Sequence, residues 1–127
     1  MILVDTNIII DFWRTPDREK EDIFKNNEIA IYPVVKAELI HGAKSEREKI
    51  KIDEALSELQ MIPIDEETWN FLGELLYELR KSGITVPFQD TLIAAAAVKS
   101  NCLLWTNDNH FSKICTVINE LKLFEAN

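Results

Sequence analysis

The sequence predicts an α/β fold with three layers, in which helices cover both faces of a central, mostly parallel sheet of about five short strands. Two observations predict it. Short apolar runs alternate along the chain with longer segments of helical character, and cap or turn residues separate the two kinds of segment. The length of 127 residues suits one hydrophobic core, so we expect a single domain over residues 1–127.

Strands and capped helices alternate through the first half of the chain. A buried apolar strand comes first, and Thr6 or Asn7 is expected to cap the helix that follows it. The Thr-Pro-Asp sequence at 15–17 favours a second helix with proline at its first position. In order, the elements expected here are a strand at 2–4, helices at 6–13 and 16–26, a strand at 29–32, and helices at 33–42 and 45–59.

The second half contains the clearest helix, which begins at three consecutive acids and ends before Gly83. Its core positions are expected to be Trp69, Leu72, Leu76 and Leu79, which recur at helical spacing. An alanine-rich helix then starts at a proline. The elements expected in this half are a strand at 61–64, helices at 65–82 and 87–99, a strand at 103–106, a short helical turn at 110–114, and an edge strand at 122–124.

Composition excludes several classes of protein. The net charge of −8, from 22 acids against 14 bases, argues against binding long nucleic acid by charge alone. It leaves open an enzyme that acts on nucleic acid through bound metal. Two cysteines are too few for a disulfide scaffold, and neither a signal peptide nor a membrane span is evident. We therefore expect a cytoplasmic protein that does not enter a membrane.

Four acidic residues lie among apolar or uncharged neighbours. Asp90 is the only charged residue in the segment 82–98, and Asp5 follows the first apolar strand directly. Asp108 and Glu38 have similarly uncharged or apolar surroundings. A buried carboxylate without a partner costs several kcal/mol or shifts its pKa until it is neutral. We therefore expect solvent to reach none of the four easily, and one shared cation to compensate them.

Topology brings the four acids toward one edge of the sheet. Asp5 and Asp108 each come just after a strand, and Glu38 and Asp90 lie in the early turns of helices. Ligands of parallel sheets bind at the carboxyl ends of the strands. Oxygen ligands of this kind favour Mg²⁺ or Mn²⁺, which can hydrolyse phosphodiester bonds. Zinc is less favoured, because the histidines and cysteines are scattered: His41, Cys102, His110 and Cys115.

Short polar residues flank two of these acids. Thr6 and Asn7 follow Asp5, and Thr106 and Asn107 precede Asp108. Side chains of this kind commonly orient carboxylates or water around a metal ion. We therefore expect these four residues to support the site or to contact the substrate.

Four segments spread over the whole chain carry this pattern: Val4-Asp5-Thr6-Asn7, Ala37-Glu38-Leu39 with Gly42, Asp90-Thr91-Leu92-Ile93-Ala94-Ala95-Ala96, and Thr106-Asn107-Asp108-Asn109-His110-Phe111. In their order and separation they resemble the PIN-domain nucleases, in particular the small VapC-like toxins of type II toxin–antitoxin systems. The resemblance implies a PIN-like fold and a metal-dependent endoribonuclease that hydrolyses RNA with Mg²⁺ or Mn²⁺. It implies Asp5, Glu38, Asp90 and Asp108 as catalytic residues and metal ligands, with Asp108 binding directly or through water. It also implies a homodimer and a cognate antitoxin that occupies the active-site groove.

Simpler roles exist for each acid taken alone: a helix cap for Asp5, a helix-dipole position for Asp90, a solvated helix face for Glu38 and a turn for Asp108. All four acids, however, lie where the topology brings them to one edge of the sheet. One shared site is therefore favoured over four separate roles. Two other functions stay open. One is a non-catalytic binding module of the same fold; the other is a Mg²⁺-dependent phosphatase with an aspartyl-phosphate intermediate on Asp5, which would usually carry a second acid where this chain has Asn7.

Other polar and aromatic residues are expected to lie outside the site. Asp11 is expected to be solvated and to reach at most the rim of the site. A surface or packing role is favoured for His110, which has no evident partner, and for His41. The three tryptophans are expected in the core or in dimer contacts: Trp13, Trp69 and Trp105.

Overall fold

The computed structural model describes residues 1–125 of the chain, so the last two residues of the expected domain lie outside the described part. Its sheet has four parallel strands in the order β3-β2-β1-β4. The strands are β1 (Ile2–Val4), β2 (Ile29–Ile31), β3 (Gln60–Met61) and β4 (Leu103–Trp105). The prediction of a parallel sheet is confirmed, but the prediction of about five strands is wrong by one.

The missing strand is the one expected at 122–124. That segment runs beside β4 and makes an isolated parallel bridge between Leu123 and Leu104. The backbone of Leu104 donates to Lys122 and accepts from Phe124. Within residues 1–125, Leu104 is the one residue of β4 that forms a bridge with this segment, so the segment covers the edge of the sheet without extending it as a strand.

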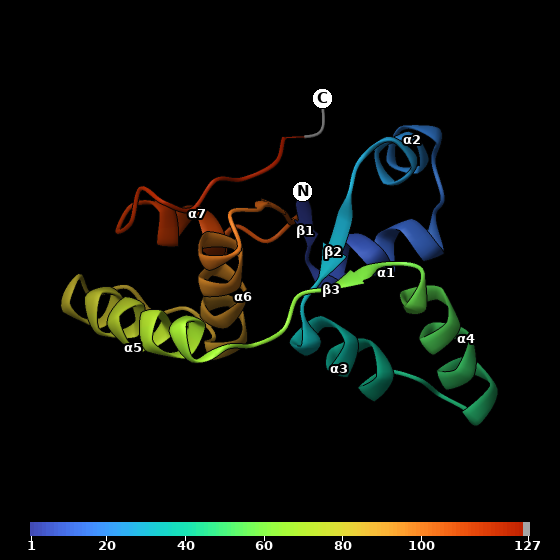
Figure 1. Cartoon of the computed structure of the whole chain (residues 1–127), viewed down its shortest axis with the longest axis horizontal. Coiled ribbons are helices and arrows are strands. Elements are labelled where there is room, and N and C mark those ends of the chain that lie inside the picture. Colours follow the sequence, from blue (N-terminus) through green and yellow to red (C-terminus); the bar gives the residue numbers. More distant parts are fainter. Residues whose placement is uncertain (126–127) are drawn as a thin grey trace.

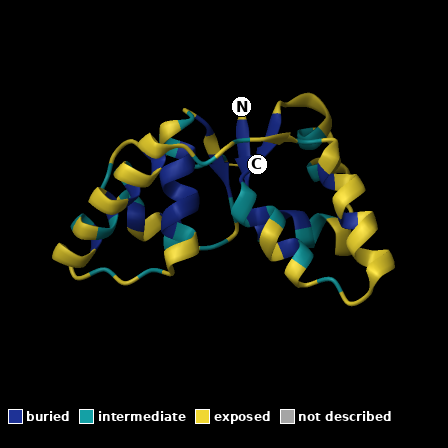
Figure 2. Cartoon of the chain, turned by 60° about the horizontal axis from the view of Figure 1, so that its bottom comes forward, coloured by how far each residue is buried: buried dark blue, intermediate teal, exposed yellow. Residues whose placement is uncertain are grey.

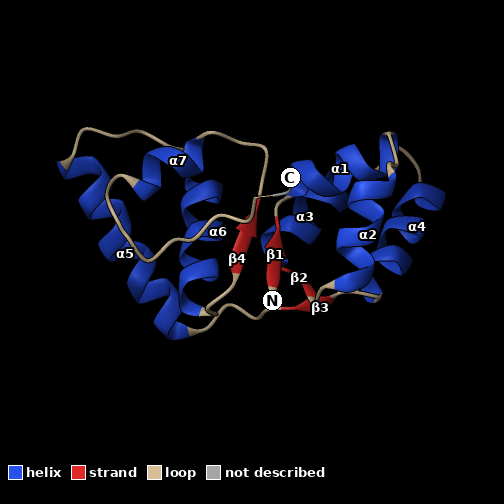
Figure 3. Ribbon diagram, turned by 90° about the horizontal axis from the view of Figure 1, so that it is seen from above, coloured by secondary structure: helices blue, strands red, loops and turns tan. Residues whose placement is uncertain are grey.

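Seven helices in the described residues cover both faces of the sheet. They are α1 (Thr6–Arg14), α2 (Arg18–Asn26), α3 (Pro33–His41), α4 (Glu46–Ser57), α5 (Glu66–Lys81), α6 (Phe88–Lys99) and α7 (His110–Cys115). Figures 1 and 3 show α5, α6 and α7 on one side of the strands and α1 to α4 on the other. The expected three-layer arrangement is therefore present. None of the helices in residues 1–125 combines the length and the apolar character needed to cross a membrane.

Helix α6 is the most deeply buried helix segment, as Figure 2 shows. Each residue from 91 to 97 is at most 3% exposed, although a helix packed on one face would leave some of them in solvent. The four alanines, which occupy little space, let the neighbouring backbones come close on every side. Asp90 lies just before this buried segment, so its side chain marks the point where the helix emerges from the core.

Two helix starts differ from the sequence-based expectation. Asp5 caps α1, and neither Thr6 nor Asn7 does, because the Asp5 carboxylate accepts the backbone N–H of Thr6. Helix α2 begins after its cap Asp17, so Pro16 precedes the helix and is not its first residue. The expected strand at 61–64 is also shorter, since β3 ends at Met61.

The core face of α5 was predicted only in part. Leu72, Leu75 and Leu79 are almost fully buried, whereas Trp69 is 46% exposed. Leu75 continues the spacing of Leu72 and Leu79 on one face, and Trp69 lies a quarter turn or so away from that face. Among the other tryptophans, Trp105 is in the core as expected and packs against Phe24 and Phe124, but Trp13 is exposed.

A buried hydroxyl at Tyr32 gives a first testable expectation. The Tyr32 side chain is fully buried and its hydroxyl has no hydrogen-bond partner among the described residues. Burial, with a smaller contribution from the charge of Asp65, raises the pKa of Tyr32 to about 12. Tyr32→Phe removes this unpaired polar group, so we expect the free energy of unfolding to stay unchanged or to rise by up to about 1 kcal/mol. Urea unfolding measures it, and a clear loss of stability would contradict the expectation.

Candidate functional site

The candidate site lies where β1 and β4 end, at the carboxyl edge of the sheet. Asp5 directly follows β1 and is only 5% exposed. One of its carboxylate oxygens accepts the N–H of Thr6 at 2.8 Å, and the other accepts the hydroxyl of Thr106 at 2.7 Å. Both oxygens of this buried carboxylate therefore have a donor, and Asp5 is held in one orientation.

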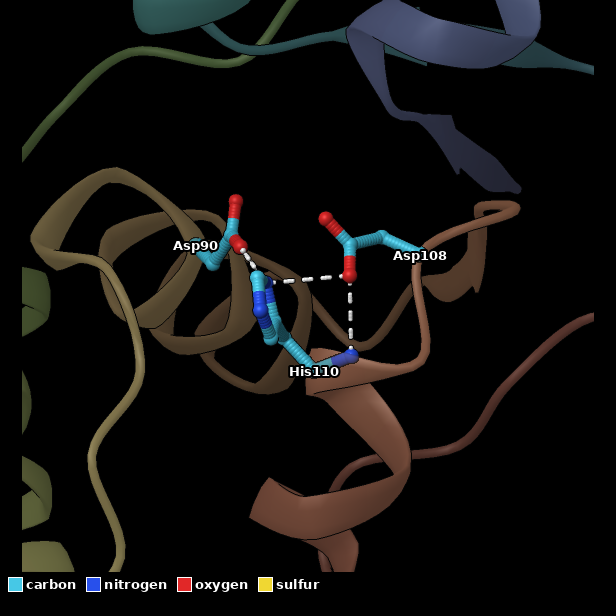
Figure 4. A group of neighbouring side chains, drawn as sticks. All are labelled: Asp90, Asp108 and His110. Atoms are coloured by element: carbon cyan, nitrogen blue, oxygen red, sulfur yellow. Dashed lines mark hydrogen bonds and ion pairs between the residues drawn. The ribbon is translucent and has the colours of Figure 1, made fainter.

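Two further acids meet a histidine, and Figure 4 shows this group of Asp90, Asp108 and His110. His110 Nδ1 lies 2.7 Å from Asp90 Oδ2 and 3.0 Å from Asp108 Oδ1. The ligand atoms of the three residues all lie within 4.8 Å of one another. Asp90 comes from the first turn of α6, while Asp108 and His110 come from the loop into α7 and its first residue. Asp90 and Asp108, which are far apart in the sequence, therefore lie close together, as the topology predicted.

Thr106 connects the two parts of the site. Its hydroxyl donates to Asp5 and accepts the backbone N–H of Asp108 at 3.0 Å. The position of the Asp108 loop is consequently tied to the buried carboxylate of Asp5. Thr106 therefore makes a hydrogen bond to each of two predicted site residues, Asp5 and Asp108.

Glu38 differs from the other three acids. The residue is exposed, so the prediction that solvent cannot easily reach it is wrong. Glu38 lies in the second turn of α3, a helix that turns this residue outward while Val35 and Leu39 face the core. The Thr6 hydroxyl donates to Glu38 Oε1 at 3.3 Å, which links it to the residue next to Asp5. Glu38 is thus at the edge of the acidic group and is not buried within it.

The two asparagines join α1 to the loop after β4. The backbone N–H of Asn107 donates to Asn7 Oδ1 at 3.1 Å. The Asn107 side-chain amide donates to Asp11 Oδ2 at 2.6 Å. Asp11 was expected to reach only the rim of the site, and its hydrogen bond from Asn107 is at that rim. In this arrangement both asparagines hold the loop beside Asp5.

Burial and mutual repulsion both act on these acids. Burial raises the pKa of Asp5 most, and the charges of Asp90 and Asp108 raise it further, against the bonds from Thr106 and Thr6. Burial also raises the pKa of Asp90, opposed by the hydrogen bond from His110. The pKa of Glu38 is raised as well, because its carboxylate is partly shielded even though the residue is exposed. Raised carboxylate pKa values are the expected property of a site that lacks compensating positive charge.

The prediction that His110 has no partner is wrong. Its ring lies between the carboxylates of Asp90 and Asp108, and its backbone N–H donates to Asp108 Oδ1 at 2.9 Å. The sequence did contain one signal. Asp108 is the middle residue of the Asn-Asp-Asn sequence at 107–109, and an aspartate in a turn commonly accepts the N–H two residues on, which here belongs to His110. The contact with Asp90, which is 20 residues away, had no signal in the sequence.

A hollow of about 400 Å³ opens beside Glu38. It lies among α1, α3 and α4, and its wall combines apolar side chains with two cationic ones. The residues that line it are Ile10, Trp13, Arg14, Glu38, Leu39, Gly42, Lys44, Glu48 and Ile52. The acidic group therefore adjoins a surface depression large enough for part of a macromolecule.

Comparison with known proteins agrees with this fold. The family model described as the PIN domain matches residues 2–117. Ribonuclease VapC2 of Rickettsia felis is 35% identical, over 93% of this chain and 95% of its own length. Ribonuclease VapC1 of Methanocaldococcus jannaschii is 28% identical, over 89% of this chain and 80% of its own length.

Solved structures show the same fold over the whole chain. In the crystal structure of VapBC2 from Rickettsia felis bound to a promoter DNA fragment, one chain is 32% identical, with a TM-score of 0.85 and full coverage of both chains. A chain of the DNA-bound VapBC from Salmonella typhimurium has a TM-score of 0.88 at 24% identity, covering 99% of this chain and 98% of that one. The second likeness bears on the fold alone. The chain therefore belongs to the PIN-domain family, and within it to the VapC-like proteins.

Proposed function

We propose that the protein is the toxin of a toxin–antitoxin pair and that it acts as an endoribonuclease, hydrolysing RNA phosphodiester bonds with the help of Mg²⁺ or Mn²⁺. One observation carries the proposal: Asp90 and Asp108 converge beside the buried Asp5 at the carboxyl edge of the sheet. The similarity to VapC ribonucleases supports the same activity. The proposed catalytic domain spans residues 1–127 as one PIN-like nuclease domain.

The donor set fits a hard divalent ion. Asp5, Asp90 and Asp108 supply carboxylate oxygens, and Glu38 supplies another from the rim. In the proposed site these four acids are the metal ligands. A bound ion would lower the pKa of a water molecule and stabilise negative charge on the phosphate. The chain itself fixes where the carboxylates lie, through Thr106 at Asp5 and Asp108 and through Thr6 at Glu38.

His110 adds a nitrogen donor that an all-carboxylate site would lack. Its Nδ1 is close enough to Asp90 and Asp108 to bind the same ion, and imidazole binds Mn²⁺ more readily than it binds Mg²⁺. We expect pulsed EPR of the Mn²⁺-loaded protein to show coupling to a nitrogen nucleus. That coupling should disappear in His110→Gln and persist in His41→Gln, since His41 lies at the far end of α3. Coupling that survives in His110→Gln would exclude this histidine as a ligand.

Thr106 is expected to tune the affinity for the ion. Thr106→Val removes the hydroxyl that holds Asp5 and Asp108, so the dissociation constant for Mn²⁺ should rise by about 10- to 100-fold. Thr106→Ser keeps the hydroxyl and serves as the matched control. Calorimetric titration measures both variants, and equal affinities for the two would contradict this role.

The proposed partners are RNA as substrate, a cognate antitoxin and a second copy of the chain. The hollow beside Glu38 supports the proposal of an antitoxin partner. A segment of the antitoxin with apolar side chains could contact Ile10, Leu39 and Ile52 in this hollow and thereby block access to the acids. Crystal structures of related chains contain VapBC complexes. We propose that the pair acts in the cytoplasm.

Cleavage of RNA by the purified protein tests the proposed function. We expect cleavage with added Mg²⁺ or Mn²⁺, loss of cleavage with a chelator, and recovery when the ion is restored. Sequencing the fragment ends would then identify the preferred RNA. Absence of cleavage by folded, metal-loaded protein would favour the alternative of a non-catalytic binding module. The phosphatase alternative is disfavoured, because such enzymes usually carry a second acid at the position where this chain has Asn7.

A further inference from the structure

One face of α1 leads from the acidic group into the hollow beside Glu38. Four residues recur along this face at helical spacing: Thr6, Ile10, Trp13 and Arg14. Thr6 lies at the acid end, where its hydroxyl donates to Glu38, and the other three line the hollow. With a rise of about 1.5 Å per residue, Trp13 lies roughly 10 Å along the helix axis from Thr6. A ligand that extends from the acids into this hollow therefore meets Trp13 in its wall.

Trp13 presents a large aromatic surface that the core does not take up. Its exposed fraction is 40%. It lines the hollow of about 400 Å³ and also a second hollow of about 290 Å³, so it lies at the junction of the two. The larger volume is within the ~300–1,000 Å³ usual for sites that bind small groups. An indole ring in such a wall offers a flat face on which any nucleobase can stack.

Three basic residues accompany Trp13 in the two hollows. Arg14 and Lys44 line the larger one, and Lys51 lines the smaller one. All three are exposed, and none forms an ion pair within residues 1–125. The opposing charge that both hollows share is Glu48. In a chain with a net charge of −8, cations gathered beside an aromatic ring favour a ligand that carries phosphate groups.

We propose that Trp13 is a stacking platform for a nucleobase of single-stranded RNA, and that Arg14 and Lys44 bind neighbouring phosphates of the same strand. The inference rests on the proposed ribonuclease function, because it places this base close to the phosphate that meets the acids. It adds a substrate contact outside the acidic group. A base within a duplex has both faces covered by its neighbours, so this contact selects unpaired nucleotides without reading their sequence.

The antitoxin proposed for the same hollow competes with this base. A purely apolar peptide uses neither the cations nor the flat face of the indole ring, so the lining as a whole favours RNA. The two occupants also differ in what they need from Trp13. Leucine at this position keeps an apolar contact for a peptide but has no aromatic face for a base. Trp13→Leu therefore separates the two occupants.

Binding of a short fluorescein-labelled oligoadenylate RNA tests the stacking contact. Ca²⁺ replaces Mg²⁺, since carboxylates also bind this ion, and a gel confirms that the RNA stays intact. Trp13→Leu should raise the dissociation constant about 10-fold, and Trp13→Phe, which keeps an aromatic face, should recover most of the affinity. Trp69→Leu is the matched control and should bind as wild type does. Trp69 is 46% exposed on α5, which lies on the other side of the strands, as Figure 3 shows.

The dependence of binding on salt tests the phosphate contacts separately. Arg14→Gln and Lys44→Gln should each reduce the slope of log affinity against log salt concentration by about 0.7, the value for one phosphate of a single strand. Lys81→Gln serves as the control, because Lys81 is an exposed cation at the end of α5. Its salt slope should equal that of wild type.

Circular dichroism confirms that each variant is folded. Wild-type protein that does not bind the RNA would overturn the proposal. So would a folded Trp13→Leu that binds as tightly as wild type, a result that leaves the hollow to the antitoxin alone. RNA cleavage that Trp13→Leu does not change would overturn the stacking contact and leave the ribonuclease function standing. Binding that depends on Trp13, in a protein that cleaves no RNA with Mg²⁺ or Mn²⁺, would support the contact and contradict only the ribonuclease function.

Discussion

Replacing Asp90 with asparagine is expected to abolish RNA cleavage and, in metal-free buffer, to raise the melting temperature. The two effects have one cause. Asp90 is a partly buried carboxylate beside Asp108, and its raised pKa means that its charged form is disfavoured in the folded chain. Asparagine removes that cost but cannot supply a negatively charged ligand. Loss of activity should exceed the ~10- to 100-fold effect usual for residues that only support metal ligands.

Asp5→Asn should behave in the same way, because burial and neighbouring acids also raise the pKa of Asp5. Asp22→Asn is the control: Asp22 is an exposed acid on α2, and its replacement should change neither activity nor melting temperature appreciably. Activity assays and thermal melts on the same preparations give both results. An Asp90→Asn protein that melts at a lower temperature and still cleaves RNA would contradict the assigned role.

The gain in stability from added Mn²⁺ is expected to grow as the pH rises. Asp5, Glu38 and Asp90 have raised pKa values in the folded chain, so between the unfolded values near 3.8 and 4.5 and the raised values the folded state binds more protons. The stability that these three groups contribute is therefore present at low pH and is lost as pH rises through the raised values. Metal binding requires the deprotonated form, so it offsets this loss at higher pH.

Thermal melts with and without Mn²⁺ across this pH range measure the effect. Asp17 and Asp65 act in the opposite direction, because their lowered pKa values favour the folded state as pH rises. The difference between wild type and Asp5→Asn isolates the site from those two groups. At 100 times the dissociation constant the ion should add about 2.7 kcal/mol to the free energy of unfolding. A metal effect that is equal at all pH values, or that shrinks as pH rises, would contradict the expectation.

Local sequence patterns predicted most of the fold. The alternation of strands and helices, the starts of α4 and α5, and the end of α5 before Gly83 all depend on neighbouring residues. Gly83 has a φ of +73°, a conformation that glycine adopts without strain. The errors lie where pairing decides the structure. The segment expected as a strand at 122–124 makes only an isolated bridge to β4, between Leu123 and Leu104, and no local pattern reveals that.

Some residues of the candidate site were predicted from the sequence and others were not. Asp5, Asp90 and Asp108 stood out because each interrupts an apolar or uncharged stretch, and the structure brings them together. Glu38 was expected to be shielded from solvent, but the orientation of α3 exposes it. His110 was missed because its partner Asp90 comes from another element. Side-chain contacts between distant elements depend on the final packing, which a single sequence does not display.

Titration of Mn²⁺ into the metal-free protein, with bound ion and RNA cleavage measured in the same samples, tests the central claim most directly. In wild type we expect cleavage to rise in proportion to the bound ion. In Asp90→Asn, purified in the same way, we expect weak binding and no cleavage above background. Cleavage by wild type without bound ion, or equal binding and cleavage by Asp90→Asn, would contradict the account.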